Sequence, residues 1–141
     1  MIKLEKLPSD ILMRIREVER VLAGDPNVAF AYLFGGLAKK EIRPLSDVDI
    51  AVYLRDTTNL AESKIRLFDS ITDVLGTSEL DLVMLNTAPV SITGRILQDK
   101  LVLVDKEPFL RHRFESVTIR EFFDFRIKED AFFSRRYSGG G

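Results

Sequence analysis

The chain has 141 residues, the length of a single domain, and its 21 basic and 22 acidic residues leave a net charge of −1. This balance argues against direct binding to nucleic acid, which normally requires an excess of positive charge. Without cysteine, the chain can form neither a disulfide framework nor a thiolate metal site. No apolar run approaches the ~20 residues of a membrane span, and charges interrupt the N-terminal segment where a signal peptide would be apolar. We therefore expect a soluble, cytoplasmic protein.

Helical and strand patterns alternate along the chain. In order, they predict a helix capped by Ser9 or Asp10 and ending at 23, a strand at 28–34, a short helix at 37–41, a strand at 47–54, a helix at 60–75, a strand at 79–85, a short helix at 90–98, a strand at 101–104 at the sheet edge and a last helix at 109–136. The helix at 60–75 is expected to bury one row of apolar residues: Ala61, Ile65, Phe68, Ile71 and Leu75.

The connection between the first two strands is too short for a crossover helix, so these strands are predicted to pair antiparallel. The expected fold is therefore an α/β domain over residues 1–137, with a mixed central sheet of about four strands flanked by helices. Residues 138–141 are expected to form a flexible tail, because three of the four are glycine.

Two carboxylates lie at the start of the second strand, in the sequence Asp47-Val48-Asp49-Ile50. Side chains alternate along a strand, so Asp47 and Asp49 should project together while Val48 and Ile50 enter the core. Two adjacent carboxylates repel each other unless a cation lies between them. Oxygen ligands without cysteine favour Mg²⁺ or Mn²⁺ over zinc. The pair therefore predicts a magnesium site.

A Gly-Gly pair ends the first strand, at Gly35 and Gly36. Glycines between a strand and a helix let backbone N–H groups approach a phosphate closely, and a helix N-terminus adds partial positive charge. The two glycines are therefore candidate phosphate-binding residues.

The Gly-Gly pair, ten further residues and Asp-x-Asp, set between two apolar strands, resemble the signature of the DNA polymerase β-like nucleotidyltransferase superfamily. The run from Ser46 to Val52 is most similar to its minimal nucleotidyltransferases (MNT), the antitoxins paired with HEPN-domain toxins. Gly36 stands where these proteins usually have serine, and Lys39-Lys40 replaces their usual Arg-Gly. Lys39 still offers positive charge to a triphosphate. Ser46 either orients Asp47 by a hydrogen bond or shapes the turn.

A third acid, Asp81, lies within the apolar run of the third strand. If this strand lies beside the second, Asp81 completes a cluster of three carboxylates; otherwise it faces solvent on a half-exposed strand. Glu79, two residues earlier, is the competing candidate. The resemblance implies that the third aspartate joins the catalytic metal and helps to deprotonate the attacking hydroxyl, with Asp47, Asp49 and Asp81 holding two Mg²⁺ ions.

Phenylalanine is concentrated in the last predicted helix, at positions 109, 114, 122, 123, 125, 132 and 133. Adjacent residues on a helix diverge by about 100°, so one small domain cannot bury both Phe122-Phe123 and Phe132-Phe133. We expect part of this helix to contact another chain, and a homo-oligomer stays open.

The resemblance implies transfer of AMP from ATP to a tyrosine hydroxyl of a HEPN toxin, which makes the chain an antitoxin. One alternative is the same chemistry on a small molecule such as an aminoglycoside. Another is a non-catalytic antitoxin that neutralises its toxin by binding alone; survival of all three carboxylates argues against it.

Overall fold

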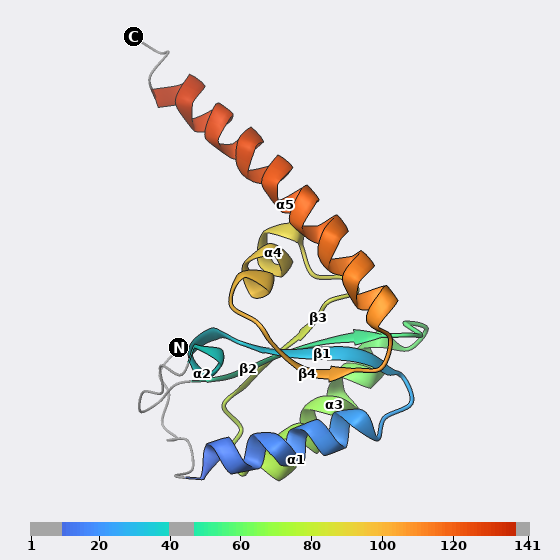
Figure 1. The fold of residues 1–141 in the computed structure, drawn as a ribbon. Coiled ribbons are helices and arrows are strands. Elements are labelled where there is room, and N and C mark those ends of the chain that lie inside the picture. Colours follow the sequence, from blue (N-terminus) through green and yellow to red (C-terminus); the bar gives the residue numbers. More distant parts are fainter. Residues whose placement is uncertain (1–9, 40–46, 138–141) are drawn as a thin grey trace.

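The computed structural model describes residues 10–39 and 47–137, and the fold is drawn in Figure 1. In chain order the elements are α1 (Ile11–Ala23), β1 (Val28–Phe34), α2 (Gly35–Ala38), β2 (Val48–Leu54), α3 (Leu60–Leu75), β3 (Leu80–Met84), α4 (Val90–Gln98), β4 (Leu101–Asp105) and α5 (Pro108–Tyr137). Every predicted element is present. The largest difference is at α2, a single turn that begins at Gly35 itself.

The four strands form one mixed sheet in the order β3-β2-β1-β4. β1 pairs antiparallel with both β2 and β4, whereas β2 and β3 are parallel and are joined through α3. The predicted α/β fold, the antiparallel first pair and the edge position of β4 are therefore confirmed. One end of the sheet gathers the end of β1 and the starts of the other three strands.

Helices α1 and α3 cover one face of the sheet (Figure 1). Both helices contribute apolar residues to the same core, with Val18, Leu22, Ile71 and Leu75 fully buried. The buried row of α3 was predicted correctly at Ile71 and Leu75, which are fully buried, and at Phe68, which packs against the core. It was wrong at Ala61 and Ile65, which are exposed, and it missed Leu67. Two neighbouring rows share Ile71 and Leu75, and periodicity alone does not decide between them.

Helix α4 and the first half of α5 cover the other face. The ring of Phe30 stacks on Tyr53 with 4.8 Å between centroids, and Phe114 of α5 lies 5.3 Å from Tyr53. Where the two helices cross, a Cβ on Gly94 would lie 2.2 Å from Cγ of Phe122. The glycine is therefore what permits α4 and α5 to pack so closely.

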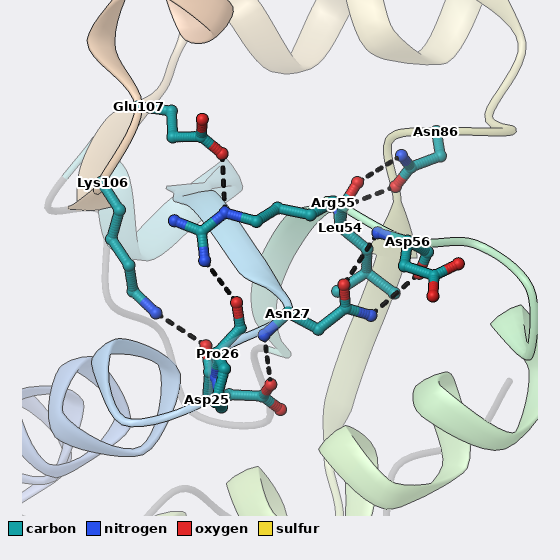
Figure 2. Close-up of polar contacts among 9 residues, drawn as sticks. All are labelled: Asp25, Pro26, Asn27, Leu54, Arg55, Asp56, Asn86, Lys106 and Glu107. Carbon is teal, nitrogen blue, oxygen red and sulfur yellow. Dashed lines mark hydrogen bonds and ion pairs between the residues drawn. The ribbon is translucent and has the colours of Figure 1, made fainter.

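Polar contacts fasten the end of the sheet where β1 begins (Figure 2). Asn27, before β1, donates to the carbonyl of Asp56 at 2.8 Å, and the amide of Asp56 donates back to Oδ1 of Asn27 at 2.8 Å. The side chain of Asn86, after β3, pairs with both the amide and the carbonyl of Leu54, each at 2.9 Å. These side chains hold three of the connections in a fixed arrangement.

Two basic side chains join the β4–α5 connection to the same network. Arg55 donates to Glu107 at 2.7 Å and to the carbonyl of Pro26. Lys106 donates to the carbonyl of Asp25 at 2.6 Å. All of these contacts lie at the end of the sheet where β1 begins. The Gly-Gly and Asp-x-Asp sequences lie at the opposite end.

Helix α5 continues beyond α4, and its C-terminal half extends away from the sheet (Figure 1). Phe122 is 6% exposed, whereas its neighbour Phe123 is 61% exposed and Phe132 is 56% exposed. The expectation that these phenylalanines cannot all be buried is confirmed. Among the described residues, no helix is both long and apolar enough to cross a membrane.

Candidate active site

Asp49 lies on β2, in the middle of the sheet, and Asp47 immediately precedes that strand. Val48 and Ile50 are fully buried, whereas both aspartates are only partly buried. Since Val48 and Ile50 pack on the α1–α3 side, Asp49 faces the α4–α5 side. The predicted alternation of core and carboxylate residues is confirmed.

Asp81 is the register partner of Asp49 across the parallel β2–β3 pair. Directly paired residues of neighbouring strands point to the same face, and the strands lie about 4.8 Å apart. Asp81 is exposed, on a strand at the edge of the sheet. Glu79 lies before β3, where its carbonyl accepts a hydrogen bond from the amide of Val48 at 2.9 Å. The structure therefore brings Asp81, and not Glu79, level with Asp49.

Asp49 and Asp81 share one end of one sheet face, and Asp47 immediately precedes β2 at the same end, but the three do not form a closed cluster. Across residues 10–39 and 47–137, no three side chains among His, Cys, Asp and Glu are gathered closely enough to hold a metal ion. The chemistry of the three carboxylates nevertheless suits Mg²⁺, which takes oxygen ligands and keeps several waters of its own.

Gly35 lies directly against the carboxylate of Asp49. Its φ of +69° is in the left-handed region, and a Cβ at this position would lie 2.2 Å from Oδ2 of Asp49. Any other residue would be strained here and would also clash with the carboxylate. The strand therefore turns into α2 with a bare backbone beside the aspartate. α2 has only four residues, so its helix dipole is negligible. This turn can therefore bind a phosphate through its backbone N–H groups.

Of the other candidates, Gly36 lies within α2 and Lys39 follows it. Nζ of Lys39 pairs with Oδ2 of Asp99 at 3.3 Å, and both side chains are almost half exposed. The charge of Lys39 is thus partly offset by an acid from the α4–β4 connection. Ser46 and Lys40 lie outside the described residues.

Lys100 was not predicted from the sequence, where it is one lysine in a polar turn. It immediately precedes β4, whose Leu101 pairs with Leu33 near the end of β1. Its Nζ lies 5.9 Å from the ring centroid of Tyr32 and 3.7 Å from Oε2 of Glu115, so the side chain lies on the same face as Asp49. Lys100 is far from Asp49 in the sequence, and β1 lies between their strands in the sheet. Its place near the carboxylates therefore follows only from the pairing of β4 with β1.

A partly buried polar network supports this face beneath Lys100. The Oη of Tyr32 donates to Oε2 of Glu115 at 2.7 Å, and Arg111 donates to Glu115 and to Asp105, each at 2.9 Å. Burial, and then the carboxylate of Glu115, raise the pKa of Tyr32, which keeps this hydroxyl protonated. The network anchors α5 to β1 and fixes the base of the site.

Two open grooves lie near these residues. One of about 370 Å³ runs along the edge strand and is lined by Asp81 together with Lys64 and Thr87. A second, of about 520 Å³, lies between α5 and the distal end of the sheet, with Tyr53 and Arg113 in its wall. Tyr53 is four residues beyond Asp49 on β2, about 13 Å along the strand. Of these two grooves, the one along the edge strand therefore includes a candidate carboxylate, Asp81.

A family model described as polymerase beta, nucleotidyltransferase, matches residues 16–109. The chain belongs to this family. The matched region contains Gly35, Gly36, Asp47, Asp49 and Asp81, and family membership makes the protein a nucleotidyltransferase. No curated protein sequence gives a significant match.

Solved structures of toxin–antitoxin complexes share the fold. A complex with AMP-PNP has 24% sequence identity and a TM-score of 0.68, over 86% of this chain and 94% of that one. The complex of a tri-AMPylated HEPN toxin with an MNT antitoxin from Shewanella oneidensis has 22% identity and a TM-score of 0.67, over 87% and 95% of the two chains. A complex named MntA-HepT has 22% identity and a TM-score of 0.66, over 87% and 96%. The match spans nearly the full length of each of these chains.

Proposed function

We propose that the protein transfers AMP from ATP to a tyrosine hydroxyl of a HEPN-domain toxin, and so acts as its antitoxin. The observation that carries this proposal is the level alignment of Asp49 and Asp81 on adjacent strands, beside a glycine backbone that leaves no room for a side chain. The similar folds of an AMP-PNP complex and of a complex with an AMPylated HEPN toxin support the choice of nucleotide and acceptor.

Asp47 and Asp49 would hold Mg²⁺ with Asp81 completing the set of ligands. When bound, Mg²⁺ supplies positive charge that offsets the triphosphate and the developing charge of the transition state. The backbone at Gly35 and Gly36 allows the phosphates to approach the sheet closely. Lys39 and Lys100 provide positive charge on the opposite side of that turn, so the triphosphate lies between carboxylates and lysines.

The acceptor hydroxyl would arrive along the groove beside β3, where Asp81 is exposed. Its oxygen attacks the α-phosphorus in line with the departing pyrophosphate, and its proton passes to a carboxylate oxygen of Asp81. One P–O bond forms to the acceptor and one breaks to the β-phosphate, which leaves as pyrophosphate. The lysines contribute to the ground-state binding of the triphosphate through their positive charge.

Intact-mass spectrometry of a HEPN-domain toxin co-expressed with this chain tests the proposal. Co-expression with the wild type should add one or more AMP units to the toxin and inactivate it. Asp49→Asn should add none and leave the toxin active, because a metal ligand is lost. Asp69→Asn makes the same change on an exposed residue of α3, on the other side of the sheet, and should behave as wild type.

The same experiment separates the alternatives. An unmodified but inhibited toxin with both wild type and Asp49→Asn would replace transfer by inhibition through binding. An unmodified and active toxin with the wild type would exclude the toxin as acceptor. Screening hydroxylated small molecules such as aminoglycosides with ATP and Mg²⁺ would then identify the acceptor class.

A further inference from the structure

The projecting half of α5 carries an exposed stripe with a self-complementary arrangement of residues. Ile119, Phe123 and Phe133 are 44%, 61% and 48% exposed. At 3.6 residues per turn these three lie with Arg126 and Asp130 in a stripe about 80° wide. We name these five residues the α5 stripe. Phe125, Ile127 and Phe132 are also exposed but lie outside this stripe. An exposed apolar stripe with no core beneath it is typical of a contact with another helix.

The charges on this half of the helix favour a second copy of this chain, and not a strongly charged protein, as the partner of the α5 stripe. Residues 117–137 contain nearly equal numbers of charged residues of each sign, five basic ones (Arg120, Arg126, Lys128, Arg135, Arg136) and four acidic ones (Glu121, Asp124, Glu129, Asp130). A balanced segment exerts little attraction on an acidic or basic protein surface. When two copies of a helix pair antiparallel, a basic residue of one copy can lie opposite an acidic residue of the other. A helix whose charges match in this way favours association with a second copy of itself.

We propose that two copies of this chain associate through antiparallel pairing of their α5 stripes, with a two-fold axis near Lys128. This register places Arg126 of each copy opposite Asp130 of the other. It also places Phe123 of each copy opposite Phe133 of the other. The two-fold axis repeats every contact, as a closed dimer requires. The proposal is independent of the reaction that the protein catalyses.

Arg126 and Asp130 are available for such a contact. Within the described part of the chain neither forms an ion pair, and the guanidinium of Arg126 lies 5.9 Å from the ring centroid of Phe122. The two residues are four positions apart on one helix, but with the base preceding the acid, which is the weaker orientation of an intrahelical pair. Pairing between copies satisfies both charges without that disadvantage.

The shape of the molecule permits the arrangement. The sheet and α4 lie beside the first half of α5 only, as Figure 1 shows. Antiparallel pairing of the projecting halves therefore places the two domains at opposite ends of the helix pair, and both candidate active sites stay open. The paired segment of about 15 residues is about 22 Å long, so the interface is small and the dimer should dissociate on dilution.

Sedimentation velocity with charge-reversal variants tests both the partner and the register. The wild type should show a concentration-dependent dimer. Arg126→Asp places two acids opposite each other and Asp130→Arg places two bases, so each variant alone should be monomeric. An equimolar mixture of the two variants should dimerise, because every opposed pair is then of opposite sign. Lys128→Asp reverses a charge on the far side of the helix and should dimerise as wild type. Circular dichroism checks the helix content of each variant.

A monomeric mixture would overturn the register, and dimerisation of either single variant alone would do the same. A wild type that is monomeric up to its solubility limit overturns the proposal outright. If that monomer associates only with its HEPN toxin, and Phe123→Ser abolishes this association, the α5 stripe belongs to the toxin interface instead.

Discussion

The two faces of the sheet are built on different principles. The face covered by α1 and α3 is closed by apolar side chains, and its core residues come from both helices and all four strands. The face covered by α4 and α5 contains a hydrogen-bonded network around Tyr32, Glu115 and Arg111, and the carboxylates of Asp49 and Asp81 at its end. The candidate carboxylates and the α1–α3 core thus lie on opposite sides of a single layer of strands. Substitution of a carboxylate should therefore affect activity with little change in stability, and substitution in that core should do the reverse.

The largest effect should come from removing a carboxylate on the second face. Asp81→Asn or Asp47→Asn should lower the rate of Mg²⁺-dependent AMP transfer about a thousandfold, equal to about 4 kcal/mol of transition-state stabilisation. The melting temperature should stay the same or rise slightly, because one of several like charges is removed. Single-turnover kinetics with ATP, together with calorimetry, measure both quantities. Full activity in either purified variant would reject the site assignment.

A core substitution on the first face should give the opposite result. Ile71→Ala removes a fully buried side chain and should lower the free energy of unfolding by about 2–5 kcal/mol. The transfer rate per folded molecule should not change. Ile65→Ala, on the same helix but at a 64% exposed position, should cost no more than about 0.5 kcal/mol. Urea unfolding compares the two; equal losses would mean that the buried row of α3 is misplaced.

The elements of the fold could be predicted from the sequence because their signals are local. Apolar periodicity, the glycine at 76 and the Pro-containing turns mark the element boundaries, and α5 differs from its predicted range by one residue at each end. The apolar row of α3 was predicted only in part, because two adjacent rows that share Ile71 and Leu75 have nearly the same periodicity. Lys100 was missed for another reason: its place beside the site depends on the pairing of β4 with β1, which no local pattern encodes.

The polar network of the second face should make an intermediate contribution. Tyr32→Phe removes the hydroxyl that donates to Glu115, and should lower the free energy of unfolding by about 1–2 kcal/mol. Tyr53→Phe is the control, since its hydroxyl has no hydrogen-bond partner among the described residues, and should be nearly neutral. Equal effects of the two substitutions would show that the hydrogen bond to Glu115 contributes no stability.

Because of the same network, the free energy of unfolding should depend on pH in the acidic range. Burial raises the pKa of Glu115, but the hydrogen bonds from Tyr32 and Arg111 and the charges of Lys100 and Arg111 outweigh it and bring the pKa below the ordinary 4.5. A carboxyl group whose pKa is lower in the folded state than in the unfolded state stabilises the fold at pH values above its unfolded-state pKa. This stabilisation is lost as the pH falls through the folded-state pKa. The wild type should therefore lose more stability below pH 4.5 than Tyr32→Phe, in which Glu115 has one donor fewer. Unfolding at a series of pH values measures this difference, and parallel curves would contradict it.

The smallest effects should come from the lysines near the Gly-Gly turn. Lys100→Gln should raise the KM for ATP several-fold, and Lys39→Gln by less, because Lys39 is almost half exposed and pairs with Asp99. Either change corresponds to about 1 kcal/mol or less of binding free energy. Lys128→Gln, on the projecting half of α5, is the control. A change in kcat without a change in KM would place these lysines outside the ground-state binding of the nucleotide.

The parallel pairing of β2 with β3 has a consequence for the order in which the site assembles. Gly35, Asp47 and Asp49 come together when β1 closes onto β2 through a short connection, whereas Asp81 arrives only after α3 has formed and β3 has crossed over to join the sheet. Closing the longer loop carries the larger entropic cost and delays the parallel pair. During refolding, pulsed hydrogen exchange should therefore protect the amides of β1 and β2 before those of β3. Transfer activity should return with β3, so a chain caught before this step would hold two of the three carboxylates and remain inactive.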